Sequence, residues 1–205
     1  MIVCHLYNKL ILLIERVLIF TSKPLFMKYF FIFFISFFSF QASFQQTLPG
    51  KSPCLSESVY RQLDFWIGEW DVYNLKGKKS GDSKISLILD SCVILEEWTS
   101  MTLPNGFVYR GKSMNTYDAK AGQWQQNWTD NVGGNTHYVK GKFEDNKMVF
   151  ETEAYQYSKD TMAIMRLTFF DLDPNKVRQF AQISKDNGKT WSTQYDLEYR
   201  RKKKG

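Results

Sequence analysis

The sequence predicts an all-β fold, an up-and-down antiparallel β-barrel of about ten strands with a short helix at its N-terminal end. Runs of β-branched, aromatic and alternating residues recur along the chain, and clusters of Gly, Pro, Asn and Asp separate them. No segment between two runs is long enough for the crossover that parallel strands need, so the sheet is expected to be antiparallel. Many sequential strands in one sheet tend to curl, and closure removes their exposed edges. A two-sheet sandwich is the alternative architecture.

An apolar run near the N-terminus predicts export. Residues 29–40 carry no charge and follow Lys28. The run is shorter than the roughly 20 residues that a membrane-spanning helix needs. Small side chains at Ala42 and Ser43 come directly after it, and a basic start, a short apolar core and small residues together form a secretory signal. We therefore expect a signal peptide over residues 27–43, cleavage close to its end, and no stable membrane span in the exported chain.

The residues before this signal are expected to be an upstream extension. Met27 lies directly before the basic residue that opens the signal, and it is the expected start, which leaves residues 1–26 outside the protein proper. The alternative is a two-part membrane anchor that uses residues 10–20. Glu15 and Arg16 lie within that run and argue against the anchor, because charge is expensive in lipid.

The charge balance of the exported chain excludes a strongly basic protein. The full chain has a net charge of +6. Loss of residues 1–43 takes away four basic side chains and one acidic side chain, which leaves +3. The terminal run at residues 200–204 supplies five of the remaining basic side chains, and residues 202–205 are expected to be a solvated tail. We therefore expect no nucleic-acid partner.

Two cysteines remain after the signal, and they predict one disulfide. Cys54 and Cys92 would join the lead-in to the turn between the second and third strands. Such a bridge contributes roughly 3–4 kcal/mol, and two separate thiols are the alternative. The exported chain has no CxxC and a single histidine, His137, so a zinc site of cysteine and histidine is not expected. No metal or other cofactor is predicted.

The barrel domain is expected over residues 56–201, after a linker at residues 44–55. Ser56 is predicted to cap a short helix over residues 57–66, and Gly68 is predicted to end it. The apolar residues that follow helical spacing are Tyr60, Leu63 and Ile67.

The first strand is predicted directly after this helix. Trp70 and Val72 alternate with Asp71 and Tyr73, which is the two-residue period of a strand with one buried face. By the same pattern, strands are expected near residues 69–74, 83–90, 93–101, 107–117, 123–130, 135–143, 147–155, 163–171, 176–183 and 190–199.

The fifth predicted strand indicates a partly polar interior. Its one face carries, in order, Trp124, Gln126, Trp128 and Asp130. The tryptophans place this face inside the barrel, but a dry core would not hold Gln126 and Asp130 without partners. Either these two side chains pair with interior polar groups such as Arg166 or Gln179, or they line a wet pocket. Both interpretations stay open at this point.

The third predicted strand carries a second polar position. Glu96 lies on the same face as Trp98 and is expected to point inward. Arg110 on the next strand is the candidate partner, and the pair would either fix the register or anchor a ligand. A carboxyl group in an apolar barrel has a raised pKa and can act as an acid or base. Because no second catalytic group is located, no catalytic residue is predicted.

One recognisable motif lies between the last two strands. Residues 184–191 fit S-x-D-x-G-x-T-W, the Asp-box that recurs on the propeller blades of sialidases. Here the motif occurs once, so a propeller is not predicted. We expect a hairpin in which Asp186 and Asn187 take turn geometry and Trp191 packs under the turn.

Several segments together resemble a bacterial family of secreted proteins of unknown function with a Phe-Trp-x-Gly-x-Trp opening. The segments are residues 65–72, 91–98, 117–124, 128–131, 177–179 and 184–191. The resemblance covers roughly residues 54–201, and the family is similar to the calycins, the group of barrels that includes the lipocalins. It implies a periplasmic or extracellular barrel that takes a small apolar or amphipathic molecule, and it implies no catalytic residue.

Three functions are compatible with these observations. The first is an exported barrel that binds a small molecule without chemistry. The second is a barrel enzyme of isomerase or hydrolase type that uses an interior carboxylate, and the third is a structural or interaction module of the cell envelope. The candidate ligand-binding residues are Glu96, Trp98, Arg110, Trp124, Gln126, Trp128, Asp130, Arg166 and Gln179.

Overall fold

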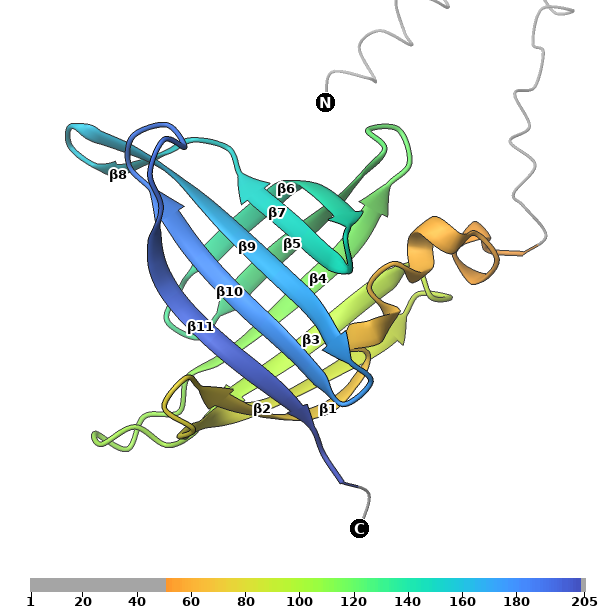
Figure 1. Cartoon of the computed structure of the whole chain (residues 1–205), viewed down its shortest axis with the longest axis horizontal. Coiled ribbons are helices and arrows are strands. Elements are labelled where there is room, and N and C mark those ends of the chain that lie inside the picture. The colour runs from red at the N-terminus through yellow and green to blue at the C-terminus, as the bar shows by residue number, and fades with distance from the viewer. Residues whose placement is uncertain (1–50, 204–205) are drawn as a thin grey trace, which may run out of the picture. The chain divides into compact units, whose positions relative to one another are not determined.

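The computed structural model describes residues 51–203, so the expected upstream extension and signal peptide lie outside the described part of the chain. Within it, a closed antiparallel barrel of ten strands carries one additional strand, β8 (Figure 1). The strands are β1 (Gly68–Asn74), β2 (Lys79–Ile88), β3 (Val93–Ser100), β4 (Arg110–Asp118), β5 (Gln123–Asp130), β6 (Asn135–Glu144), β7 (Lys147–Thr152), β8 (Tyr155–Ser158), β9 (Thr161–Asp173), β10 (Lys176–Ser184) and β11 (Ser192–Arg201).

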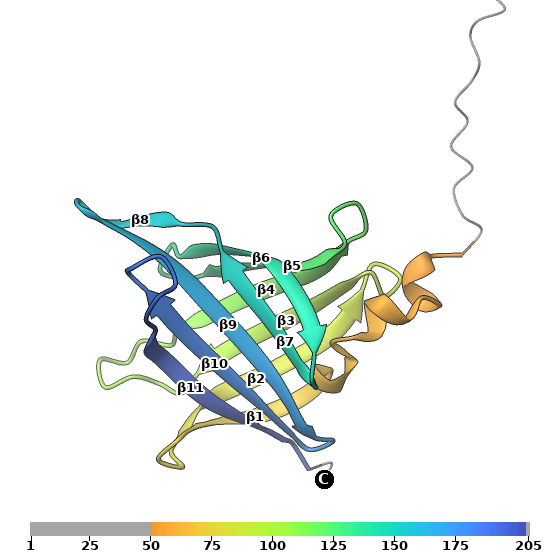
Figure 2. The same cartoon turned by 45° about the horizontal axis from the view of Figure 1, so that its top comes forward.

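Closure of the barrel depends on β9, β10, β11 and β1. Each strand from β1 to β6 pairs with the next one, β7 pairs with β9, and β9 pairs with β10. The ring is completed because β11 pairs with both β10 and β1. Figures 1 and 2 show the strands running obliquely around one interior. The predicted all-β antiparallel barrel is therefore confirmed, and the chain does not form the alternative sandwich.

The strand β8 was not predicted. The sequence pattern suggested one strand over residues 147–155, but β7 ends at Thr152, and Tyr155–Ser158 forms a separate strand. β8 pairs only with the first residues of β9, outside the closed ring. Its residues alternate aromatic and polar side chains, but three of the four are exposed, so neither face of β8 belongs to the core.

The lead-in to the barrel differs from the predicted single helix. Three 3-10 turns occupy it, η1 (Pro53–Leu55), η2 (Ser58–Arg61) and η3 (Asp64–Trp66), and Ser56 follows η1 instead of capping a helix. The buried residues of the last two turns and their junction are Tyr60, Leu63 and Trp66. Their spacing of three matches the three residues per turn of a 3-10 helix, which brings all three to one side.

These turns close one end of the barrel. Trp66 is fully buried, and its ring centroid lies 4.4 Å from that of Phe169 on β9. Tyr60 meets Tyr117 of β4 edge to face at 5.4 Å. Leu63 is also fully buried in the same apolar cluster. We call this region the plugged end.

A disulfide fixes the turns to the sheet. Cys54 in η1 is bonded to Cys92, directly before β3, with the two Cα atoms 4.9 Å apart. The predicted pairing is confirmed. Arg61 adds a second attachment, because its Nη2 donates to the carbonyl oxygen of Ser91 at 2.7 Å. Residues 53–55, expected to belong to a linker, are thus part of the folded unit.

The first strand follows the predicted alternation. Trp70 and Val72 are fully buried, and the Trp70 indole N–H donates to the carbonyl oxygen of Trp66 at 2.9 Å. Gly68 has φ +140°, a conformation that side chains strongly disfavour, and it marks the change from the 3-10 turns to the strand. The hydrogen bond from Trp70 therefore joins the plug directly to the barrel wall.

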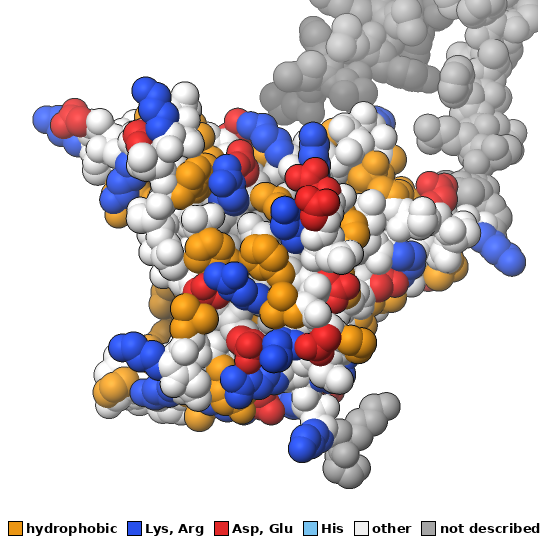
Figure 3. Space-filling view, in the orientation of Figure 1, with side chains coloured by type: hydrophobic (Ala, Val, Ile, Leu, Met, Phe, Trp, Pro, Cys, Tyr) orange, Lys and Arg blue, Asp and Glu red, His pale blue; other side chains and the backbone are white. Residues whose placement is uncertain are grey.

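The outer face over β9, β10 and β11 carries charges of both signs, as Figure 3 shows. Arg178 forms a two-point pair with Asp196, with its Nη2 2.6 Å from Oδ2. Arg166 pairs with Glu151 at 2.7 Å. This face therefore carries mixed rather than single-signed charge. Among residues 51–203, no helix combines the length and apolar character needed to cross a bilayer.

Candidate functional site: the cavity at the open end

The inward residues change character along each strand. In order from the plugged end, they are Ile94, Glu96 and Trp98 on β3 and Trp124, Gln126 and Trp128 on β5. Ile94 and Trp124 belong to the packed apolar cluster. The other four line a cavity of about 540 Å³. The end of the barrel opposite the plug is therefore hollow, and we call it the open end.

The cavity wall is predominantly aromatic. Six aromatic residues line it: Trp98, Tyr109, Trp128, Tyr138, Tyr195 and Tyr199. Three aliphatic residues extend the apolar surface: Leu103, Met165 and Leu197. The polar residues of the wall are Glu96, Ser100, Gln126, Asp130, Thr136 and Gln179. A mainly apolar wall with a few convergent polar groups is typical of small-molecule sites.

A set of hydrogen-bonded side chains separates the cavity from the packed end. We call it the polar belt, and its members are Ser83, Glu96, Ser113, Asn115, Gln126, Gln179 and Tyr199. All of them are buried. They come from β2, β3, β4, β5, β10 and β11. The belt thus reaches across most of the barrel interior at the level where the packed core ends.

Glu96 is the centre of the belt. Its Oε1 accepts from the Ser83 hydroxyl at 2.8 Å and from the Tyr199 hydroxyl at 3.1 Å. Its Oε2 accepts from the Ser113 hydroxyl at 3.2 Å. Burial raises the pKa of Glu96 to about 7, although these three hydrogen bonds oppose the rise. Glu96 therefore holds its proton far more tightly than an exposed carboxyl group does.

The hydrogen bonds continue from Glu96 in both directions. Asn115 Nδ2 donates to the Ser113 hydroxyl oxygen at 3.1 Å, and Gln126 Nε2 donates to Asn115 Oδ1 at 2.7 Å. On the other side, the Tyr199 hydroxyl lies 3.0 Å from Gln179 Oε1. A Tyr hydroxyl has one proton. When Glu96 is protonated, it can donate to the Tyr199 oxygen while Tyr199 donates to Gln179.

Asp130 is the second carboxylate of the cavity wall. Its Oδ1 accepts from the backbone N–H groups of Val132 and Gly134 at 3.0 and 2.7 Å. Its Oδ2 accepts from the Tyr109 hydroxyl at 2.8 Å and from the Trp128 indole N–H at 3.2 Å. Desolvation opposes ionisation, but these hydrogen bonds outweigh it and lower the pKa of Asp130. Asp130 is therefore a permanent negative charge at the open end.

Tyr109 stays a hydrogen-bond donor over the whole neutral range. Burial and the hydrogen bond to Asp130 raise the pKa of Tyr109 to about 12. Its ring centroid lies 6.3 Å from that of Trp128, and both side chains donate to the same oxygen of Asp130. Gly111 gives Trp128 its place, because any side chain at Gly111 would overlap the indole.

Three predicted site residues lie outside the cavity wall. Arg110 is exposed and does not pair with Glu96, because the two-residue period of β4 turns Gly111 inward and Arg110 outward. Trp124 lies in the packed core, where its indole N–H donates to Gln62 Oε1 at 2.9 Å. Arg166 lies on the outer face of β9 and pairs with Glu151. The expected interior partners of Gln126 and Asp130 are thus replaced by Asn115 and Tyr109.

The sequence interpretation missed several wall and belt residues. Tyr195, Leu197 and Tyr199 alternate on β11, and the same two-residue period would have placed them on one face. Ser113 and Asn115 alternate in the same way on β4. Tyr109 lies directly before β4 and shares the parity of Gly111, Ser113 and Asn115, so the same period within the predicted strand over residues 107–117 would have placed it inward as well.

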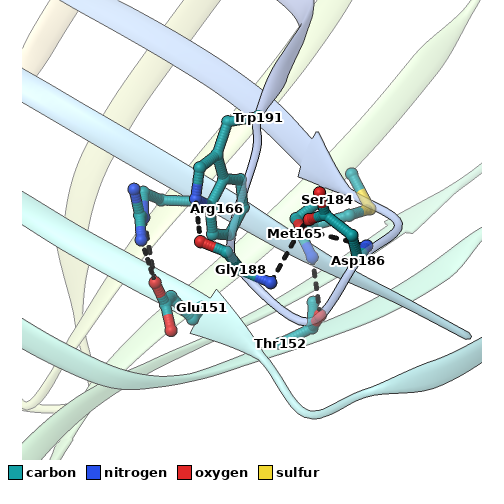
Figure 4. A network of polar contacts seen from close by, with 8 residues as sticks. All are labelled: Glu151, Thr152, Met165, Arg166, Ser184, Asp186, Gly188 and Trp191. Atoms are coloured by element: carbon teal, nitrogen blue, oxygen red, sulfur yellow. Dashed lines mark hydrogen bonds and ion pairs between the residues drawn. The ribbon is translucent and has the colours of Figure 1, made fainter.

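The Asp-box forms the hairpin between β10 and β11 at the open end. Figure 4 shows its network: the Ser184 hydroxyl donates to Asp186 Oδ1 at 2.8 Å, and the Trp191 indole N–H donates to the Gly188 carbonyl oxygen at 3.1 Å. The Arg166 guanidinium lies 3.8 Å from the centroid of the Trp191 ring, on the outer face. The motif therefore stabilises a turn, as expected.

His137 and the cysteines provide no further site. His137 is exposed on β6, with Nε2 3.4 Å from Gln125 Oε1. Within residues 51–203, no three His, Cys, Asp or Glu side chains are grouped so that they could hold a metal ion. Comparison of the chain with models of protein families and with curated proteins finds no match. The site is therefore interpreted from its own geometry.

Proposed function

We propose that this protein is an exported barrel that binds a small amphipathic molecule in its open-end cavity without changing it covalently. The observation that carries the proposal is the cavity itself, about 540 Å³ lined by six aromatic side chains. Ligand cavities typically measure 300–1,000 Å³ and are mostly apolar. A barrel that served only as a scaffold would gain stability by filling this space, because close packing is favourable.

The polar belt favours a ligand with a polar end. Gln126 is 2% exposed and Gln179 is 6% exposed, and both line the cavity. Within residues 51–203, Gln126 Oε1 and Gln179 Nε2 form no hydrogen bond, whereas the other half of each amide does. Neither atom belongs to the fully buried side-chain atoms that lack a partner, so both are accessible from the cavity. A polar group of the ligand that reaches the belt would pair with them.

Export is supported by the disulfide and by the apolar run. The Cys54–Cys92 bond fits an oxidising compartment. Residues 27–43 have the composition of a signal peptide, as described above. We place the protein in the periplasm or outside the cell on these two grounds.

A proton-transfer enzyme of the isomerase type is the second candidate. One observation favours it: Glu96, with a pKa raised to about 7 by burial, lies 3.1 Å from the Tyr199 hydroxyl in the same cavity. Such a pair can take a proton from a bound molecule and return it. The ligand-binding proposal is preferred because Glu96 already accepts three hydrogen bonds and is only 2% exposed.

Native mass spectrometry with two matched variants tests the binding proposal. Thr136→Trp places an indole in the cavity, while His137→Trp places one on the outer face of the same strand. We expect protein purified from its own host to carry a small molecule that the first variant loses and the second retains. Retention of the same mass by Thr136→Trp would contradict the proposal. So would the absence of a bound mass together with no uptake of an apolar dye.

A further inference from the structure

The cavity wall carries acidic groups without basic ones, and the more exposed of them, Asp130, is half-buried. The wall contains two carboxyl groups, Glu96 and Asp130, and no Lys, Arg or His. Neither carboxyl group takes part in an ion pair within residues 51–203. By contrast, Glu97 on the outer face of β3 pairs with Lys112 at 2.8 Å. The protein thus balances this outer carboxylate but leaves the negative charge of the cavity without a counter-ion.

The hydrogen bonds around Asp130 determine what kind of counter-ion fits. A carboxylate has about four lone-pair sites. Asp130 already accepts four hydrogen bonds, from Val132, Gly134, Tyr109 and Trp128. It keeps its charge but has no free acceptor site for an N–H donor. The charge therefore favours a cation that needs no hydrogen bond.

The aromatic wall supplies the matching surface. Tyr109 and Trp128 each donate a hydrogen bond to Asp130 from the edge of the ring, and these two residues and Trp98 line the same cavity. The face of an aromatic ring attracts a cation by roughly 0.5–2 kcal/mol, most strongly when the cation is desolvated. A carboxylate beside aromatic faces is a site for a cation with an apolar surface.

We propose that the ligand of the open-end cavity is a quaternary ammonium compound or another cation without N–H groups, held by the charge of Asp130 and the rings of Tyr109 and Trp128. This inference rests on the proposed binding function. The apolar body of the ligand fills the aromatic wall. Its polar end reaches Gln126 and Gln179 in the belt.

Equilibrium dialysis of the purified full chain with three probes tests this proposal. Benzyltrimethylammonium is the cation, neopentylbenzene is its uncharged carbon isostere, and benzylsulfonate is an anion. With wild-type protein, we expect the cation to bind at least about tenfold more tightly than the anion. Equal or tighter binding of the anion would overturn the proposal, and this result requires no variant.

A pair of charge-removing variants makes the test specific. In Asp130→Asn, we expect the affinity for benzyltrimethylammonium to fall about tenfold and that for neopentylbenzene to stay within about twofold. Asp118→Asn is the matched control. Asp118 likewise accepts backbone N–H groups in a strand turn, but it lies at the plugged end, so neither affinity should change.

The outcomes separate this inference from the proposed function. If Asp130→Asn weakens both probes equally or neither, the cation proposal is wrong, while binding of neopentylbenzene that Thr136→Trp abolishes still supports a ligand-binding barrel. If no probe binds to wild-type protein and no host molecule is retained, both proposals fail. If Asp130→Asn does not fold, Trp128→Leu takes its place in the test. In that variant, the affinity for benzyltrimethylammonium must fall more than the affinity for neopentylbenzene, or the proposal is wrong.

Discussion

The plugged end and the open end of this barrel are built from the same strands, yet only one of them is filled. At the plugged end, Leu63 and Trp66 enter from the 3-10 turns and are fully buried among inward side chains. At the open end, the connection between β3 and β4 contributes Leu103 and Tyr109 to the wall, and within residues 51–203 a cavity of about 540 Å³ remains. The two-residue period of a strand determines which side chains point into the barrel. Whether the interior at one end is packed depends on the 3-10 turns that precede β1.

The polar belt marks the boundary between the two ends. Polar side chains would be costly inside the plugged end, whereas at the boundary they bond to one another and face the cavity. Glu96 illustrates the difference, because it lies one position along the inward face from Ile94 in the core and from Trp98 in the cavity wall. The packed core that stabilises the fold thus lies at the plugged end. The polar and aromatic side chains that line the cavity lie at the open end.

The largest expected effect is the removal of a plug indole. Trp66→Ala should lower the free energy of unfolding by about 3–5 kcal/mol, because it leaves a void in a packed cluster. Trp98→Ala should cost less, about 1–2 kcal/mol, because Trp98 borders open space. Urea unfolding of both variants measures the difference. Equal losses would show that the two ends do not differ in packing.

The disulfide should contribute almost as much. Replacing Cys54 and Cys92 together by serine should lower stability by about 4 kcal/mol, because the loop that is released spans 38 residues. The bond attaches the plug, so ligand affinity of the folded protein should stay the same. Thermal unfolding with and without ligand measures both quantities. A loss of affinity in the folded variant would mean that the plug also shapes the cavity.

The ionisation of Glu96 should make stability depend on pH. Burial raises its pKa from 4.5 to about 7, so the folded protein binds this proton more tightly than the unfolded chain does. The stabilisation is complete below pH 4.5 and disappears as the pH rises to above 7, a change of about 3 kcal/mol. Glu96→Gln should flatten this part of the profile of unfolding free energy against pH.

Glu97→Gln is the control for this effect. Glu97 is the next residue on β3, points outward and pairs with Lys112, so its replacement should leave the slope between pH 4.5 and 7 as in the wild type. A wild-type profile without that slope would show that Glu96 is not the buried acid described here.

The sequence was sufficient to predict which strand residues face the interior of the barrel, but not which polar groups they pair with there. Alternation alone placed Glu96, Trp98 and Trp128 on inward faces, and the structure confirms each of them. The expected pairing of Arg110 and Arg166 with interior carboxyl and amide groups ran against this alternation. The period of their own strands turns both outward.

The plug was mispredicted for a different reason. Leu63 and Trp66 lie in a segment whose apolar spacing is compatible with an α-helix, but it forms separate 3-10 turns that pack into the core of the barrel. Tyr109 differs, because it continues the inward parity of Gly111 and Ser113, and only its hydrogen bond to Asp130 depends on tertiary structure. Inward positions were thus predictable from the period, whereas the polar partners and the turns of the plug were not.

The smallest expected effect on stability comes from a change in the polar belt, at the boundary between the packed core and the cavity. Gln126→Leu removes the donor to Asn115 and leaves an acceptor unpaired, but it adds apolar contact at the edge of the core. The two changes oppose each other, so stability should stay within about 1–2 kcal/mol of wild type. Affinity for a ligand with a polar end should fall, because Gln126 Oε1 is lost from the cavity wall.

Gln125→Leu, on the outward side of β5, is the control and should alter neither ligand affinity nor the hydrogen bonds of the polar belt. If Gln126→Leu instead destabilises the protein as strongly as Trp66→Ala, the belt belongs to the packed end, and the boundary between core and cavity lies farther toward the mouth.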